Sequence, residues 1–236
     1  MQYMNNPFDF FDAIFCINLD SRPDRWQECL EKFKILNIED KVQRFSAIRI
    51  VDGNNMSNKF LARCGCSLSH FEICRIAKLK GYKNYLVLED DFELNLKKEE
   101  IFDLLNKAVS ELPYSWDMFY LGGNLTDEYG IFPIENFSDN LFKLNSCHTT
   151  HAMAFNQKFY DQYLENAPDF NSIFEWTHKN EVIDVFLTKE FLRKINCFIN
   201  KKLVINQAAG FSDIENASYD YRDWMSHNFE FFKNKI

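Results

Sequence analysis

Three consecutive carboxylates, Glu89, Asp90 and Asp91, are the residues whose types and spacing point most directly to chemistry. They follow the short apolar run 85–88, and like charges this close repel one another unless a positive charge lies among them. Mg²⁺ or Mn²⁺ would supply that charge, and both ions commonly bind phosphate oxygens as well. This acidic motif therefore indicates a metal and phosphate site, although a helix cap or a solvated loop would also explain it.

Two arginines, Arg22 and Arg25, lie three residues apart where a helix is expected to begin. Backbone N–H groups at a helix start point outward and attract anions, so a nucleotide or a diphosphate could bind there. The alternative is a pair of surface arginines that form ion pairs with Asp20 and Asp24. Spacing alone leaves both interpretations open.

Residues 65–70 (GCSLSH) are expected to precede or open a helix. Ser67 or Ser69 would serve as an ordinary N-cap of that helix. His70 would either donate a hydrogen bond to a ligand or lie in the core with its hydrogen bonds made to other protein groups.

Asp184 is placed in the first turn of a predicted helix over residues 182–195. A carboxylate there either complements the helix dipole or acts as a general base. A late polar cluster, Gln207 with residues 211–214, has a spacing that indicates no chemistry by itself.

The cysteines and histidines show no zinc-ligand spacing. The seven cysteines match no disulfide framework, and we expect mostly buried, reduced thiols in an intracellular protein. His148 and His151 lie three residues apart, so on an extended segment they would face opposite sides.

These candidate residues require a sheet to position them. Apolar runs at 13–19, 42–48, 85–88 and 118–121 are predicted strands, and they alternate with predicted helices at 24–37, 68–80 and 98–112. Asp20 or Ser21 would cap the first helix, Pro23 would open it, and Gly81 would close the second. Further strands are expected at 141–144, 151–155, 198–199 and 203–205, and further helices at 157–166 and 182–195.

This alternation predicts an α/β fold with a mainly parallel central sheet flanked by helices. No linker or repeat divides the chain, so we expect one domain over 1–236, with a core over about 12–215 and an extension or lid over 216–236. Ligands of such sheets gather beyond the carboxyl ends of the strands, where several of the candidate residues lie.

Composition narrows the class of protein. The net charge of −8 offers no positive field for nucleic acid. The first residues do not resemble a signal peptide, and no apolar stretch approaches the roughly 18 residues of a membrane span. We therefore expect a cytoplasmic or intracellular protein, peripheral to a membrane only if its acceptor is membrane-borne.

Three segments together resemble glycosyltransferase family 25, which includes lipooligosaccharide and collagen galactosyltransferases. They are residues 17–25 (INLDSRPDR), 65–70 (GCSLSH) and 87–91 (VLEDD), in the family's order. The likeness continues through Trp116-Asp117, residues 120–122 (YLG), Asp184, Gln207 and Ser212-Asp213. It implies a GT-A fold, a UDP-sugar donor, Mn²⁺ or Mg²⁺, and transfer with inversion.

The resemblance also implies roles for individual residues. Asp184 would be the catalytic base that deprotonates the acceptor hydroxyl. The residues expected to bind the metal are Glu89, Asp91 and Asp213, with His148, His151 and His227 as alternative third ligands. The residues expected along the nucleotide are Asn18, Asp20, Arg22, Arg25, Ser69, His70, Asp90 and Ser212.

The function expected from this resemblance is transfer of a hexose, galactose or glucose, to a hydroxyl of a glycan or of hydroxylysine in a protein. One alternative is a catalytically silent UDP-sugar-binding module, which would bind the nucleotide without turnover. Another is a metal-dependent phosphohydrolase, but the chain lacks a second carboxylate cluster for two-metal chemistry.

Overall fold

The computed structural model describes residues 3–51, 56–212, 217–220 and 222–236. Eight strands form its central sheet, in the order β2-β1-β3-β10-β5-β11-β8-β7. The strands of the sheet are β1 (Ala13–Asn18), β2 (Val42–Ser46), β3 (Asn84–Glu89), β5 (Met118–Tyr120), β7 (Ile134–Asn136), β8 (Leu141–Leu144), β10 (Ala152–Asn156) and β11 (Cys197–Asn200).

Most strands of this sheet run in one direction. β1 pairs in parallel with β2 and β3, and β5 with β11, whereas β10 and β8 run antiparallel to their neighbours. The expected α/β class, with a mainly parallel sheet between helices, is therefore confirmed. The reversed strand β10 lies between β3 and β5 and brings the residues that precede it next to the end of β3.

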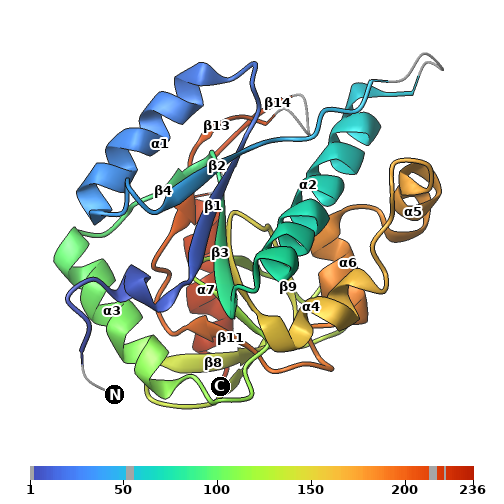
Figure 1. Cartoon of the computed structure of the whole chain (residues 1–236). Coiled ribbons are helices and arrows are strands. Elements are labelled where there is room, and N and C mark those ends of the chain that lie inside the picture. The colour runs from blue at the N-terminus through green and yellow to red at the C-terminus, as the bar shows by residue number, and fades with distance from the viewer. Residues whose placement is uncertain (1–2, 52–55, 213–216, 221) are drawn as a thin grey trace.

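Helices cover both faces of the sheet (Figure 1). α1 (Pro23–Leu36) and α3 (Lys98–Glu111) lie on one side, and α2 (Asn58–Lys80), α4 (Gln157–Leu164) and α6 (Ile183–Glu190) lie on the other. The remaining elements are η1 (Pro7–Phe10), α5 (Ile173–Asn180), α7 (Arg222–Lys233), β4 (Phe92–Glu93), β6 (Asn124–Leu125), β9 (Cys147–His148), β12 (Asn206–Gln207), β13 (Gly210–Ser212) and β14 (Ala217–Tyr219).

Two hydrophobic cores form because successive side chains of a strand point to opposite faces. In β1, Phe15 belongs to the core beneath α2 and α4, whereas Ile14 and Cys16 belong to the core beneath α1 and α3. Such strands must be apolar along their whole length, and all six residues of β1 are buried. All seven cysteines are free thiols, and six are buried, as expected.

The start of α2 differs from the sequence prediction. The helix begins at Asn58, ten residues before the expected start, and Ser57 is its N-cap. Ser67 and Ser69 therefore lie inside the helix and are not caps. The apolar periodicity weakens over residues 58–67, because this part of α2 is less buried than the remainder. The predicted end is correct, since Gly81 closes the helix with a φ of 69°.

Other expectations were also wrong, and one helix was not predicted. Arg22 is the N-cap residue of α1 without a side-chain bond, so neither Asp20 nor Ser21 caps it, although Pro23 opens it as predicted. Residues 203–205 do not form the expected strand, and the strand in this region is the two-residue β12 (Asn206–Gln207). α5 was not expected.

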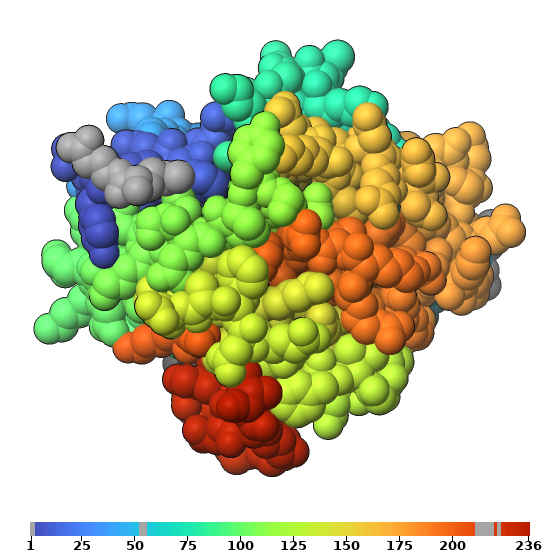
Figure 2. All heavy atoms as spheres, turned by 90° about the horizontal axis from the view of Figure 1, so that it is seen from below, coloured from blue at the N-terminus to red at the C-terminus, as the bar shows by residue number. Residues whose placement is uncertain are grey.

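The C-terminal helix α7 packs against β6 and β12, and the ring of its Phe229 lies 6.2 Å from that of Phe142 in β8. Phe229 and Phe232 are buried, and the rings of Phe132 and Phe232 meet edge to face with centroids 5.7 Å apart. In Figure 2 the red C-terminal residues project beside the yellow-green part of the chain. The proposed lid role of 216–236 and the 12–215 core boundary remain predictions. Within the described ranges, none of the helices combines the length and apolar content of a membrane crossing.

Candidate active site

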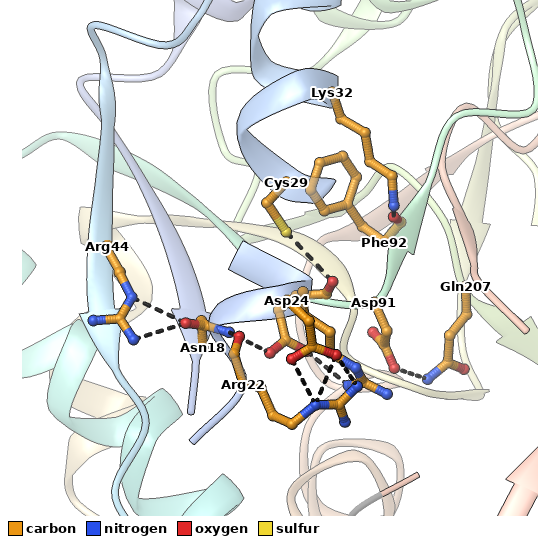
Figure 3. Close-up of polar contacts among 11 residues, drawn as sticks. Asn18, Arg22, Asp24, Cys29, Lys32, Arg44, Asp91, Phe92 and Gln207 are labelled. Carbon is orange, nitrogen blue, oxygen red and sulfur yellow. Dashed lines mark hydrogen bonds and ion pairs between the residues drawn. The ribbon is translucent and has the colours of Figure 1, made fainter. Parts of the chain in front are cut away.

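The acidic motif lies at the carboxyl end of β3, where the buried strand stops and its last residues turn out of the sheet. Glu89 is the last residue of β3, Asp90 is buried, and Asp91 is half-buried. Two side chains of α1 hold this turn: Cys29 Sγ donates to the Asp90 carbonyl at 3.3 Å, and Lys32 Nζ to the Phe92 carbonyl at 2.6 Å (Figure 3).

Asp90 is fixed by two side chains from the first β-strand and first α-helix. Asn18 Nδ2 donates to Asp90 Oδ2 at 2.7 Å, and Arg25 Nη1 lies 2.8 Å from Asp90 Oδ1. The Arg25 and Asp90 side chains are only 15% and 10% exposed. Burial raises the pKa of Asp90, while Arg25 and Asn18 act to lower it. The structure therefore brings together three residues that were predicted to lie along a nucleotide.

Arg44 belongs to the same network, although the sequence analysis did not identify it. Its Nε and Nη2 donate to Asn18 Oδ1 at 3.0 and 2.7 Å (Figure 3). Arg44 Nη2 also lies 2.8 Å from Asp20 Oδ1, and Ser46 Oγ donates to Asp20 Oδ2 at 2.6 Å. The signal for Arg44 is its place in β2, which pairs in parallel with β1 and ends at the same sheet edge.

The two arginines at the start of α1, Arg22 and Arg25, have different partners. Arg22 forms an exposed ion pair with Asp24, with Nη2 and Oδ2 2.9 Å apart, as the surface interpretation proposed. Arg25 instead pairs with Asp90, and Asp20 pairs with Arg44. The ion pair of Arg22 with Asp24 that the surface interpretation proposed is therefore present, whereas Arg25 pairs with the buried Asp90.

Glu89 receives hydrogen bonds from two directions. His70 Nε2 lies 2.9 Å from Glu89 Oε1, and Thr150 Oγ1 donates to the same oxygen at 2.5 Å. Burial opposes ionisation of Glu89, but the contacts with His70 and Thr150 lower the pKa of its carboxyl below the ordinary value. The His70 ring is thus oriented toward the acidic motif, and Glu89 is held as an anion.

Residues 65–70 contribute from the middle of α2. A Cβ atom on Gly65 would lie 2.1 Å from the Ile48 carbonyl oxygen, so only glycine allows the segment after β2 to cross the helix here. Ser69 Oγ donates to the Gly65 carbonyl at 2.7 Å and accepts from the Ile48 backbone N–H at 2.9 Å. These contacts fix the part of α2 that carries His70. A contact of Ser69 with a nucleotide remains a prediction.

Asp91 carries an incompletely satisfied carboxylate. Gln207 Nε2 donates to Asp91 Oδ2 at 2.9 Å (Figure 3), whereas Asp91 Oδ1 is buried without a hydrogen-bond partner among the described residues. Burial and the neighbouring charges of Glu89 and Asp90 raise the pKa of Asp91 to about 7. A buried oxygen of this kind, in a negative field, fits a cation ligand.

Asp184 lies in the first turn of α6, as predicted. Its Oδ2 accepts from the Thr149 backbone N–H at 3.0 Å, and its Oδ1 accepts from the Val185 backbone N–H at 2.7 Å. Burial, followed by the charges of Glu89, Asp184 and Asp91, raises the pKa of the Cys66 thiol well above its ordinary value. Cys66 therefore lies in a negative field to which all three carboxylates contribute.

The structure describes the residues proposed as third metal ligands to different extents. Asp213 falls outside the described residues, and of Ser212 only its backbone in β13 is described. His148 lies in β9, and His151 is buried with Nε2 3.4 Å from the Ile205 carbonyl. The described part of the chain holds one group of three or more residues that could bind a metal, formed by Cys66, His70 and Glu89. A hollow of about 390 Å³ between α4, α5 and α6 lies elsewhere.

Comparison with known proteins relates the chain to one family. It is 32% identical over 131 residues to the inactive glycosyltransferase 25 family member 3 of Homo sapiens and 30% identical over 154 residues to a glycosyltransferase 25 family member of Drosophila melanogaster. It is 27% identical over 129 residues to procollagen galactosyltransferase 1 of Danio rerio. The alignments cover 48%, 55% and 48% of this chain, but only 22%, 24% and 21% of those proteins.

Among solved structures, the chain superposes on a glycosyltransferase involved in the glycosylation of the major capsid of PBCV-1. The TM-score is 0.46 at 10% identity, over 91% of this chain and 98% of that one. No family model matches the chain. Its sequence nevertheless resembles the glycosyltransferase 25 family members over about half of its length.

Proposed function

We propose that the chain is a nucleotide-sugar glycosyltransferase that uses a divalent cation at the acidic motif. The observation that carries this proposal is the buried, unpartnered Oδ1 of Asp91, flanked by Glu89 and by the Asp90 network, among the residues the structure describes. Burial, and then the neighbouring negative charge, raises the pKa of the Asp91 carboxyl to about 7, and its anion is stabilised when a cation binds beside it.

Asp91 and Glu89 would hold the cation, and Asp213 is proposed as a third ligand. Mn²⁺ or Mg²⁺ bound there would neutralise charge on the departing nucleotide diphosphate. Arg25 and Asn18 act through Asp90, because they fix the turn that places Asp91. The side chains proposed along a nucleotide are those at this sheet edge, Asn18, Asp20, Arg22, Arg25, Ser69, His70, Asp90 and Ser212.

Asp184 is proposed as the general base. Backbone N–H groups of Thr149 and Val185 donate to its two oxygens, which fixes the direction of the carboxylate. It would take the proton of the acceptor hydroxyl as that oxygen bonds to the anomeric carbon and the bond to the UDP oxygen breaks. One base and no covalent intermediate correspond to inversion.

The donor is proposed to be a UDP-hexose, with galactose favoured over glucose by the family resemblance. The acceptor is proposed to be a hydroxyl of a glycan or of hydroxylysine in a protein. The similar proteins include a procollagen galactosyltransferase, which supports galactose as the first sugar to test.

Thermal unfolding with and without Mn²⁺ tests this proposal, using UDP, UDP-galactose, UDP-glucose, UDP-N-acetylglucosamine and GDP. A ligand at about 100 times its Kd adds roughly 2.7 kcal/mol. For a chain of this size this amount should raise the midpoint by several degrees. We expect an Mn²⁺-dependent shift that is specific to UDP compounds and absent in Asp91→Ala. No shift with any nucleotide would refute the donor site.

A second candidate is a catalytically silent UDP-sugar-binding module. It is favoured by the names of several similar proteins, which are called inactive or probable inactive family members. This candidate predicts the same nucleotide shift without turnover. Sugar transfer to any acceptor that is lost in Asp91→Ala would exclude it.

A further inference from the structure

Cys66, His70 and Glu89 converge beside the acidic motif, from two different elements. Cys66 and His70 lie four residues apart on α2, so their side chains share one face of that helix. Glu89 faces them from the end of β3. One potential ligand atom from each residue lies within 4.8 Å of the other two.

The three ligand types together select for zinc. A thiolate and an imidazole suit Zn²⁺, whereas Mn²⁺ and Mg²⁺ prefer sets made of oxygen alone. In a tetrahedral zinc site with bonds of about 2.0–2.3 Å, the ligand atoms are roughly 3–4 Å apart. The observed group is therefore close to this geometry, and small rotations of the Cys66 and Glu89 side chains would complete it.

The site is built on rigid parts of the fold, so little ordering is needed on binding. His70 is only 2% exposed, and α2 is held here by the crossing of the Ile48 segment over Gly65. Glu89 Oε1 is fixed by Thr150 as well as by His70. Ligands that are placed in advance by their surroundings bind metal more tightly.

The electrostatic surroundings also favour a cation. Glu89, Asp91 and Asp184 all act on the Cys66 thiol. Their combined negative charge opposes formation of a bare thiolate and would be offset by a divalent ion. Binding would release the thiol proton to solvent, and the neutral His70 ring would carry its one N–H proton on Nδ1 so that Nε2 could bind the ion beside Glu89 Oε1.

We propose that Cys66, His70 and Glu89 form a zinc site with three protein ligands and a fourth position open to water or an anion. Three protein ligands and one open position are typical of zinc sites that exchange ligands and do not only stabilise a fold. The site is distinct from the proposed Mn²⁺ position at Asp91 but shares Glu89 with it. Zn²⁺ is therefore expected to weaken Mn²⁺ binding at the acidic motif.

Cobalt substitution of the metal-free full chain tests the proposal, because thiolate bound to Co²⁺ gives an ultraviolet charge-transfer band. We expect this band at one Co²⁺ per chain, its removal by one equivalent of Zn²⁺, and its persistence when Mn²⁺ is added in equal amount. A wild-type chain without the band overturns the proposal, whatever the variants do.

Cys66→Ser should abolish the band and weaken Zn²⁺ binding at least about tenfold. Cys64→Ser is the matched control, because Cys64 lies on the same helix but its thiol contacts Thr177 Oγ1 at 3.3 Å. We expect an unchanged band in this control, and a band that persists in Cys66→Ser would overturn the proposal. If Cys66→Ser does not fold, Glu89→Gln provides a second variant, in which the band should weaken and shift.

The cobalt test of the zinc site is independent of the transferase proposal. Asp91→Asn should keep the cobalt band while losing any Mn²⁺-dependent binding of UDP. A band without nucleotide binding would support the zinc site alone, and nucleotide binding without a band would refute the zinc site alone.

Discussion

Thr149 holds the carboxylate of Asp184 through its backbone, with N and Oδ2 3.0 Å apart, and it does so with a φ of 74°. A threonine in this left-handed region is strained, so the surrounding contacts must enforce the conformation. The next residue, Thr150, donates to Glu89. Two adjacent residues thus connect the proposed base with the acidic motif.

Asp184→Asn should retain UDP and Mn²⁺ binding but lose transfer by about 10²–10⁴-fold, since this is the usual contribution of a positioned base. The amide removes the proton acceptor while preserving side-chain size. Steady-state transfer and nucleotide binding would be measured on the same sample. Glu181→Gln is the control, because Glu181 is an exposed acid just before the same helix. Undiminished transfer in Asp184→Asn would exclude the assignment.

Thr150→Val should weaken Mn²⁺ binding about tenfold, because Glu89 loses the hydroxyl donor that orients it. Thr150→Ser retains the hydroxyl and should restore binding. Calorimetric titration of Mn²⁺ in the presence of UDP gives both affinities. Equal affinities for the valine and serine variants would show that the hydroxyl does not position Glu89.

The sequence predicted the strands well where burial on both faces makes them continuously apolar. β1 and β3 are of this kind, and the acidic motif was correctly placed at the end of β3. The clustering of Asn18, Arg25 and Asp90 followed from the convergence of parallel strands at one edge. These features depend on local pattern, which a sequence displays directly.

What the sequence did not predict depends on contacts between distant segments. Gly65 was assigned to a helix start. In the structure it lies in the middle of α2, where the lack of a side chain leaves room for the Ile48 carbonyl. Arg44 has no local motif and joins the site only because β2 pairs with β1. Thr150 reaches the acidic motif because β10 is inserted in reverse beside β3.

Arg25→Met should destabilise the fold by about 3 kcal/mol, because it leaves the Asp90 carboxylate largely buried without its charge partner. Asp90→Asn in the Arg25→Met background should recover part of this loss, since the uncompensated charge is removed. A double-mutant cycle by urea denaturation measures both effects. Additive effects of the two substitutions would mean that the pair does not interact in the folded state.

Gly65→Ala should destabilise the protein by about 2–3 kcal/mol, because the new methyl group overlaps the Ile48 carbonyl oxygen. In an unconstrained helix interior the same change would stabilise by up to about 1 kcal/mol, so the sign of the effect is decisive. Ser67→Ala serves as the control, because Ser67 lies two residues away and its buried Oγ has no hydrogen-bond partner within the described ranges. Urea denaturation gives all three stabilities.

His151 should make the fold sensitive to mild acid. Burial lowers the pKa of His151 to about 4, below its ordinary value of 6.5. Between these two values the unfolded chain binds a proton that the folded chain does not, so stability contributed by neutral His151 above pH 6.5 is lost as the pH falls toward 4. From pH 7 to pH 5 this effect amounts to at most about 2 kcal/mol. Burial determines the pH range over which folded His151 gains a proton, since its ring lies between Thr149 and the Ile205 carbonyl.

His151→Gln isolates this effect from the carboxylates that also titrate in acid. Glutamine can still donate to the Ile205 carbonyl but does not ionise, so the variant should lose less stability than the wild type between pH 7 and pH 5. Urea denaturation of both proteins at the two pH values gives the difference directly. Parallel losses in the two proteins would show that His151 is protonated in the folded state, and therefore that its ring has access to solvent or to a counter-charge. Glu89 is the carboxylate that would supply that charge, because its negative field already acts to raise the pKa of His151 against the larger effect of burial.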